Sequence, residues 1–124
     1  MKTLIVDDSK MIRGIERTVL ATFGCKEIVE SSNAADALRL LQSFEPDLAV
    51  VDGSLAGEGS AEFIRAFRQK FPRAAVILVT AQTDQASAVE AIKAGVTAYL
   101  VKPFTPDLLM QRIEEACGRL TRAA

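Results

Sequence analysis

The feature that most constrains this fold is a set of five short apolar runs separated by segments with helical periodicity. Most of the runs are continuous rather than alternating in polarity, which is typical of parallel strands covered on both faces. The second run fits an edge of the sheet, because it contains Glu27 and is flanked by Lys26 and Glu30. The five runs are Leu4–Val6, Glu27–Val29, Leu48–Val51, Ala75–Val79 and Ala98–Val101.

The gaps between these runs carry apolar residues at the spacing of one helix face. Gly24 and Gly95 stand where a first and a fourth helix would end, and Phe71 with Pro72 would end a third. The expected buried stripes are Ile12, Ile15, Val19 and Phe23; Ala34, Ala37, Leu38 and Leu41; Phe63, Ile64 and Phe67; Val89 and Ile92; and Leu109, Ile113, Ala116 and Leu120. The expected amino-terminal caps are Ser32 or Asn33, Ser60, Thr83 or Asp84, and Thr105 followed by Pro106.

Strand and helix therefore alternate along 124 residues, which is the size of one domain. Right-handed crossovers between parallel strands place helices on both faces of the sheet. We expect a single domain over residues 1–124, folded as a doubly wound, three-layer α/β sandwich. The flavodoxin-like (βα)5 arrangement, with a parallel sheet in the order 2-1-3-4-5, fits this pattern.

The composition excludes several classes of function. The formal net charge is −1, so no general electrostatic attraction draws the chain to nucleic acid or anionic lipid. Histidine is absent, which argues against zinc sites, and the widely separated Cys25 and Cys117 fit buried thiols. Carboxylates come too early for a signal peptide, and no apolar run approaches the roughly 18 residues of a membrane span. We expect a cytoplasmic protein with neither direct nucleic-acid binding nor membrane insertion.

Polar side chains stand at the carboxyl ends of four of the five expected strands. Asp7 and Asp8 follow the first strand, Asp52 ends the third, Thr80 ends the fourth, and Lys102 follows the fifth. In a sheet of this order, function collects at the carboxyl edge, at the switch point between the first and third strands. Each residue alone is commonplace, as a helix cap, a structural hydroxyl or a surface charge. Their shared position on one rim indicates a common site.

Three carboxylates at this rim would repel one another, at a cost on the order of 1–4 kcal/mol for each pair about 4 Å apart. An oxygen-ligated cation relieves this repulsion, and Mg²⁺ fits better than Ca²⁺, which usually takes more ligands. Asp52 is the candidate nucleophile toward phosphorus, because its strand is central and Asp7 and Asp8 can hold the metal. With phosphorylated Asp52, Mg²⁺ and Lys102 in place, roughly one negative charge remains for the Thr80 hydroxyl and backbone amides to share.

These residues belong to motifs that resemble those of CheY-like response-regulator receiver domains, which act in two-component signalling. The resemblance extends over essentially the whole chain. Its motifs are Val6-Asp7-Asp8-Ser9, Val51-Asp52, Val79-Thr80-Ala81, Ala94-Gly95-Val96-Thr97-Ala98-Tyr99-Leu100 and Lys102-Pro103-Phe104.

The resemblance implies a role for each residue of the rim. Asp52 would accept a phosphoryl group from the phosphohistidine of a sensor histidine kinase or a histidine phosphotransfer protein. Asp8 would bind Mg²⁺ directly and Asp7 partly through water, with Asp52 itself and the Ser54 backbone carbonyl as further ligands. Lys102 would pair with the phosphoryl oxygens.

The resemblance also implies a switch. Thr80 would move to bond the phosphoryl group, and Tyr99 would turn inward into the space that opens, although an aromatic residue on an edge strand also occurs as simple packing. The small Ala81 would leave the site accessible, and the Lys102–Pro103 peptide would be cis. Phosphorylation would then change the surface of the fourth helix, fifth strand and fifth helix for a downstream effector protein.

Such a domain promotes its own phosphorylation and dephosphorylation and is not a conventional enzyme. The family resemblance fits a monomer or a weak, phosphorylation-dependent dimer. The segment 53–59 departs from the family pattern, because it has three glycines where the family often shows Met-Pro. We expect this loop to be mobile, with consequences for metal binding or for the partner surface. Ser54 and Gln82 stand where the family varies its rate of phosphoryl hydrolysis.

Three other interpretations fit parts of the pattern. The same receiver occurs as one domain of longer regulators such as transcription factors. A Mg²⁺-dependent phosphatase with an aspartyl nucleophile, of the haloacid-dehalogenase type, needs a D-x-D motif after the first strand and a cap over the site, and this chain has neither. A flavin- or dinucleotide-binding module needs a glycine- or hydroxyl-rich loop where Asp7 and Asp8 would repel a phosphate.

Overall fold

The computed structural model describes residues 1–54, 60–81 and 85–123, with side chains except those of residues 85–88 and 119–123. Strands and helices alternate throughout this part of the chain. The strands are β1 (Lys2–Val6), β2 (Glu27–Ser31), β3 (Leu48–Asp52), β4 (Ala75–Thr80) and β5 (Ala98–Val101). The helices are α1 (Lys10–Phe23), α2 (Ala34–Leu40), α3 (Ser60–Lys70), α4 (Gln85–Ala94) and α5 (Pro106–Ala123).

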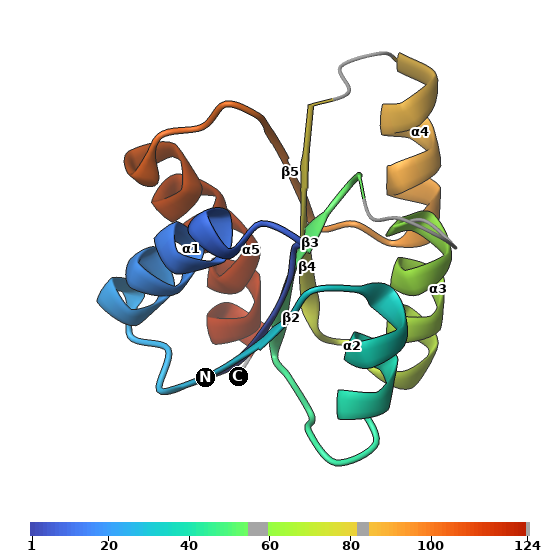
Figure 1. The fold of residues 1–124 in the computed structure, drawn as a ribbon, viewed down its shortest axis with the longest axis horizontal. Helices are drawn as coiled ribbons and strands as arrows, with labels where there is room; N and C mark the ends of the chain where they lie inside the picture. The colour runs from blue at the N-terminus through green and yellow to red at the C-terminus, as the bar shows by residue number, and fades with distance from the viewer. Residues whose placement is uncertain (55–59, 82–84, 124) are drawn as a thin grey trace.

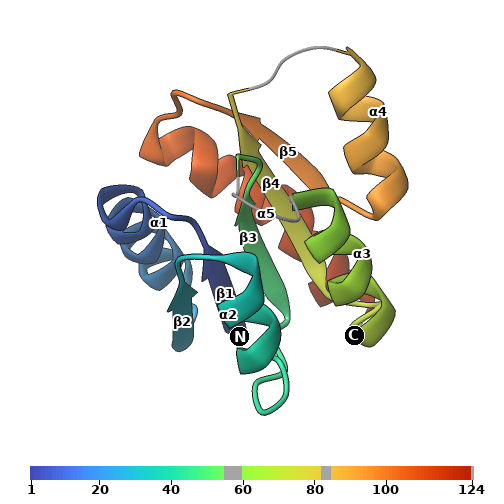
Figure 2. The same cartoon turned by 45° about the vertical axis from the view of Figure 1, so that its right-hand side comes forward.

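The sheet has the strand order β2-β1-β3-β4-β5, and every neighbouring pair is parallel. Helices α1 and α5 cover one face, whereas α2, α3 and α4 cover the other, as Figure 1 and the turned view in Figure 2 show. The doubly wound, three-layer architecture and the strand order predicted from the sequence are confirmed, including the edge position of β2.

Two apolar cores fill the spaces between the sheet and its helices, because successive strand residues point to opposite faces. In β1, Leu4 and Val6 belong to the core beneath α2, α3 and α4, whereas Ile5 belongs to the core beneath α1 and α5. β3 and β4 are buried along their whole length, as their continuous apolar runs predict. The same alternation decides on which side of the sheet each strand-end side chain lies.

Polar side chains and a glycine fix the ends of the first two helices. Ser9 caps α1 by accepting the Ile12 N–H at 3.2 Å, and Gly24 ends this helix with a φ of 116°. Asn33 caps α2 by accepting the Asp36 N–H at 2.7 Å. The predictions for Gly24 and Asn33 are therefore confirmed.

The other predicted caps have different outcomes. Thr105 caps α5 as predicted, because its hydroxyl accepts a backbone N–H three residues later at 3.1 Å. Ser60 is instead the first residue of α3, and its hydroxyl donates to the Gly53 carbonyl at 3.4 Å. The predicted caps of the fourth helix, Thr83 or Asp84, lie outside the described residues, as does the side chain of Leu120.

The buried face of α4 differs from the sequence prediction. Val89 and Ile92 are 43% and 68% exposed, whereas Ala91 and Ala94 are buried in the core. Small side chains on the inner face let the helix lie close to the sheet, and this turns the larger residues outward. The predicted stripe of Val89 and Ile92 was therefore wrong.

Arg68 ties the carboxyl ends of α3 and α4 together. Its guanidinium donates to the carbonyls of Phe71, Pro72 and Ala74 after α3, and to the Gly95 carbonyl after α4 at 2.7 Å. Gly95 ends α4 as predicted, with a φ of 110°, and a Cβ at this position would meet Arg68 Nε at 3.0 Å. The glycine therefore allows both the left-handed turn and the close approach of the guanidinium.

Two sequence expectations about bulk properties can be compared with the structure. Cys25 and Cys117 are buried thiols, as predicted. Within the described residues, no helix combines the length and apolar character required to cross a membrane.

Candidate functional site

Three carboxylates meet at the carboxyl edge of the sheet. Asp7 and Asp8 follow β1 and Asp52 ends β3, and one oxygen of each carboxylate lies within 4.8 Å of the others. Asp7 and Asp52 are buried, with exposures of 0% and 2%, whereas Asp8 is exposed. The pairing of β1 with β3 produces this cluster, because neighbouring parallel strands end at the same edge.

Asp52 accepts hydrogen bonds from two neighbours. Lys102 Nζ donates to its Oδ1 at 3.1 Å. The Ser54 backbone N–H donates to Oδ1 at 3.1 Å, and the Ser54 hydroxyl lies 3.0 Å from Oδ1 and 3.1 Å from Oδ2. An ammonium, an amide and a hydroxyl therefore fix the orientation of a carboxylate that has little access to solvent.

Lys102 connects the acidic cluster to β4. Its Nζ lies 3.8 Å from Asp7 Oδ2, and its backbone N–H donates to the Thr80 carbonyl at 2.8 Å. Burial lowers the pKa of Lys102, but the hydrogen bond to Asp52 and the charges of Asp7 and Asp52 outweigh burial, so the pKa is raised overall. The peptide bond between Lys102 and Pro103 is cis, as the family resemblance implies.

Asp7 has one buried oxygen, Oδ2, without a hydrogen-bond partner among the described residues. Its Oδ1 accepts the Ser9 N–H at 2.9 Å. Burial raises the pKa of Asp7; the Ser9 hydrogen bond and Lys102 lower it, whereas the charges of Asp52 and Asp8 raise it, and the net shift is upward. A divalent cation would satisfy Oδ2 and offset the repulsion between the carboxylates, so the donor set fits an oxygen-ligated metal such as Mg²⁺.

Arg13 fixes the turn that carries Asp7. Its Nη1 donates to the Asp7 carbonyl at 2.7 Å, and its Nε donates to Glu30 Oε1 at 3.0 Å. Arg17 donates to the other Glu30 oxygen at 2.6 Å, and the hydrogen bonds from Arg17 and then Arg13 lower the pKa of Glu30. Helix α1 therefore holds the end of β1 against the edge strand β2.

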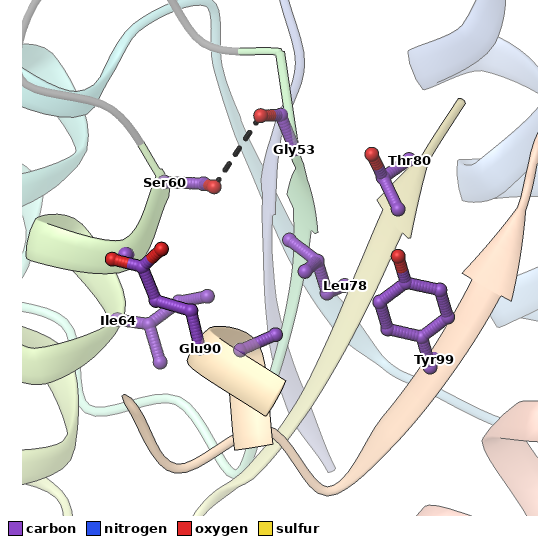
Figure 3. A pocket seen from close by; sticks show the side chains of 9 residues that line it. Gly53, Ser60, Ile64, Leu78, Thr80, Glu90 and Tyr99 are labelled. Atoms are coloured by element: carbon purple, nitrogen blue, oxygen red, sulfur yellow. Dashed lines mark hydrogen bonds between the residues drawn. The ribbon is translucent and has the colours of Figure 1, made fainter. Parts of the chain in front are cut away.

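Thr80 and Tyr99 lie together on the side of the sheet that α3 and α4 cover. With Gly53, Ser60 and Leu78, they line a cavity of about 90 Å³. Figure 3 shows the Tyr99 hydroxyl pointing toward Thr80. Thr80 is buried and Tyr99 is half-buried against the core of this side. The structure thus brings both predicted switch residues to one cavity, and Tyr99 lines that cavity in this structure.

Glu16 is a buried carboxyl that the sequence analysis did not single out. It lies on the inner face of α1 with an exposure of 1%, and its Oε1 has no hydrogen-bond partner in the described part of the chain. Burial raises the pKa of Glu16 to about 8; the charges of Asp7 and Asp52 raise it and that of Lys102 lowers it. The available signal was its helical spacing, since Glu16 lies four residues before the buried Leu20.

The structure describes the beginning of the glycine-containing loop but not most of it. Gly53 and Ser54 are described, whereas residues 55–59 and Gln82 lie outside the described residues. The expected mobility of this loop therefore stays a prediction. Ser54 is placed beside Asp52, through the donors given above.

Residues 3–114 match the family model of the response regulator receiver domain. The chain is 34% identical over 122 residues to the chemotaxis protein CheY of Pseudomonas aeruginosa, covering 97% of this chain and 98% of that protein. It is 29% identical over 121 residues to the chemotaxis protein CheY1 of Helicobacter pylori, covering 95% of this chain and 98% of that protein.

Solved structures show the same likeness. A CheY-like response regulator receiver domain protein from Methanospirillum hungatei JF-1 has a TM-score of 0.91 at 25% identity, over 99% of this chain and 98% of that one. The BeF3-activated receiver domain of DrrB has a TM-score of 0.86 at 27% identity, over 95% of this chain and 97% of that one. The similarity therefore extends over nearly the full length of the chain.

Proposed function

Because this chain belongs to the response regulator receiver domain family, we propose that it is a phospho-accepting receiver in two-component or phosphorelay signalling. Asp52 takes a phosphoryl group from the phosphohistidine of a sensor histidine kinase or a histidine phosphotransfer protein. The observation that carries the proposal is the buried Asp52 carboxylate, 3.1 Å from Lys102 Nζ and clustered with Asp7 and Asp8.

The acidic cluster would hold the metal ion. Asp7, Asp8 and Asp52, with the Ser54 backbone carbonyl, are the residues that would bind Mg²⁺. The support is the buried Asp7 Oδ2, which has no hydrogen-bond partner among the described residues, together with the convergence of three carboxylates and the oxygen-only donor set. When bound, Mg²⁺ supplies positive charge that offsets the carboxylates and the phosphoryl oxygens.

The residues of the chain supply the rest of the chemistry by position and charge. One Asp52 oxygen forms a bond to phosphorus while the bond between phosphorus and the donor nitrogen breaks, and that electron pair leaves with the donor imidazole. The Lys102 ammonium pairs with the phosphoryl oxygens, and its raised pKa keeps it protonated at neutral pH. Phosphoryl transfer depends mainly on such positioning and charge neutralisation.

The proposed switch begins on the other side of the sheet. Thr80 moves to bond the phosphoryl group, and Tyr99 follows by settling deeper into the cavity that both residues line. This biases an existing equilibrium of the surface formed by α4, β5 and α5, which a downstream effector protein recognises. The single domain over residues 1–124 acts as a monomer or a weak, phosphorylation-dependent dimer.

The family consists of signalling domains rather than conventional enzymes. The proposed activity is accordingly limited to one phosphoryl group per chain, which the domain takes up and later loses by hydrolysis. Residues around Asp52, including Ser54, set how long the phosphoryl group lasts.

The test is the substitution Asp52→Asn, which keeps the shape of the side chain but removes the nucleophilic carboxylate. With a small-molecule phosphoramidate donor and Mg²⁺, intact-protein mass should show phosphorylation of the native chain and none of the variant. Asp47→Asn is the matched control, because Asp47 is an exposed carboxylate just before the opposite end of the same strand. Stoichiometric labelling of the Asp52→Asn variant would refute the assignment.

A further inference from the structure

Gly53 occupies a constrained position directly after Asp52. Its N–H donates to the Val79 carbonyl at 2.7 Å, which continues the pairing of β3 with β4 one residue beyond the strand. Its carbonyl accepts the Ser60 hydroxyl at 3.4 Å. Both backbone groups therefore hold the turn after Asp52 against the end of β4.

This close approach leaves no room for a side chain at position 53. A Cβ at Gly53 would lie 2.6 Å from Thr80 Cβ and 2.7 Å from Thr80 Oγ1, nearer than real Cβ contacts. Rotation of the Thr80 side chain cannot relieve the shorter contact, because the Cβ position is set by the backbone. The φ of Gly53 is not positive, so space rather than backbone conformation accounts for the glycine.

The contact closes a ring of interactions around the site. Asp52 is bonded to Gly53 in the chain, Gly53 packs on Thr80, and the Thr80 carbonyl accepts the Lys102 N–H at 2.8 Å. Lys102 Nζ then returns to Asp52 at 3.1 Å. The spacing between Gly53 and Thr80 therefore influences both the acceptor and the cation that faces it.

We propose that Gly53 is a positioning residue that gives Thr80 its resting place, and that a side chain at position 53 displaces Thr80 from this place and so lowers the free energy needed for Thr80 to move to a phosphoryl group. The second half of this inference rests on the proposed function, whereas the steric half does not. The absence of a Cβ lets the unphosphorylated domain hold Thr80 in the cavity beside Tyr99. Leaving that position costs free energy, which the phosphoryl group must supply.

The first experiment compares Gly53→Ala with Gly14→Ala in the unphosphorylated, metal-free protein. Gly14 is the control, because a Cβ there meets no atom within 4 Å and its φ is not positive. We expect the ¹H–¹³C resonance of the Thr80 methyl group to shift in Gly53→Ala and to stay in place in Gly14→Ala. An unchanged Thr80 resonance in Gly53→Ala would overturn the inference, whatever the stability of the variant.

A second pair of variants keeps the test decisive if Gly53→Ala does not fold. Thr80→Gly removes the Cβ that the new methyl group would meet, so Gly53→Ala with Thr80→Gly should fold as well as Thr80→Gly alone. Circular dichroism and urea unfolding measure this. Failure of the double variant, where Thr80→Gly alone folds, would show that the Thr80 contact is not the constraint.

The link to phosphorylation is measured with beryllofluoride, a mimic of the acyl phosphate, in the presence of Mg²⁺. Gly53→Ala should bind it about fivefold more tightly than the native chain, because Thr80 no longer leaves a favourable resting place. Equal or weaker binding would overturn the switch half of the inference. If the native chain binds no beryllofluoride, the proposed function fails, and the Thr80 resonance still tests the steric half.

Discussion

The two sides of the sheet differ in what they carry at the same edge. Asp52 pairs with Val79 in the register of β3 and β4, so Thr80 comes one residue later and points to the opposite face. Strand alternation places the side chains of Asp7, Asp52 and Lys102 toward α1 and α5. Thr80 belongs with the cavity beneath α3 and α4.

The difference concerns the surroundings as well as the residues. The side of α1 and α5 contains buried charges, carboxyl groups with raised pKa values, and carboxylate oxygens without hydrogen-bond partners among the described residues. The other side has a cavity lined largely by apolar and hydroxyl groups. The proposed phosphoryl acceptor and the proposed switch residue Thr80 therefore lie on opposite faces of the sheet. They meet at the rim, where Gly53 packs on Thr80 and Lys102 bonds its carbonyl.

The largest expected effect is that of Asp8→Ala on Mg²⁺ binding, which should leave the other side of the sheet unchanged. Removal of the exposed carboxylate of the cluster should weaken Mg²⁺ binding at least about 100-fold, because a direct ligand is lost. Without metal, the Tyr99 ring resonances should be unchanged, since Asp8 belongs to the acidic cluster and Tyr99 lines the cavity beneath α3 and α4. Mg²⁺ titration followed by NMR checks both, with Asp107→Ala, an exposed acid on α5, as the control. Native affinity in Asp8→Ala would contradict the metal assignment.

The variant Glu16→Leu tests the raised pKa of the buried carboxyl group on α1. The folded pKa of about 8 lies above the ordinary value of 4.5, so the folded state holds the proton more tightly than the unfolded chain. The stability that this tighter proton binding contributes is fully present below pH 4.5, and it is lost as pH rises toward the folded pKa of about 8. Leucine has no proton to lose, so its contribution to stability does not fall as pH rises. The free energy of unfolding of the variant should therefore exceed that of the native protein by about 2 kcal/mol at pH near 8, and by less in mild acid.

Urea unfolding without Mg²⁺, at several pH values, measures this difference. The charged groups that act on Glu16 are Asp7, Asp52, Glu30 and Lys102, and all are kept in the variant. Glu114→Leu, an exposed acid on α5, controls for surface changes. A difference from the native protein that does not grow with pH would contradict a raised pKa of Glu16.

The smallest effect is expected for Thr80→Ala, on the side of the sheet that α3 and α4 cover. Phosphorylation of Asp52 should remain stoichiometric, because Thr80 contributes neither the nucleophile nor a metal ligand. The movement of the Tyr99 ring resonances on adding beryllofluoride should shrink, and affinity for the mimic should fall about fivefold, or roughly 1 kcal/mol. Thr18→Ala, at an exposed position of α1, is the control. Full movement of the Tyr99 resonances would show that Thr80 is not the link.

Most of the rim could be predicted from the sequence. Parallel strands covered on both faces appear as apolar runs, and the residue that ends each run must reach the same edge of the sheet. This rule alone places Asp7, Asp52, Thr80 and Lys102 at one edge of the sheet. Their roles still rest on the proposal.

The remaining features depend on distances between elements, which spacing along a chain does not encode. The inner face of α4 is set by how closely the helix approaches the sheet, which favours Ala91 and Ala94 over the larger Val89 and Ile92. The tight contact at Gly53 requires the register of two strands and the turn between β3 and α3. A glycine-rich loop predicts freedom, whereas Gly53 itself is held by two hydrogen bonds.

The Arg68 hydrogen bonds fix one end of α4 and leave its other end outside this network. They join the carboxyl end of this 10-residue helix to the end of α3, at the edge of the sheet opposite the acidic cluster. These bonds hold the carboxyl end of α4 at Gly95, so a tilt of the helix that keeps them moves mainly its other end. With a rise of about 1.5 Å per residue, a tilt of about 10° at Gly95 carries the far end of the helix through roughly 2.6 Å. A tilt of this size moves the surface of α4 and leaves the Arg68 bonds at its carboxyl end in place.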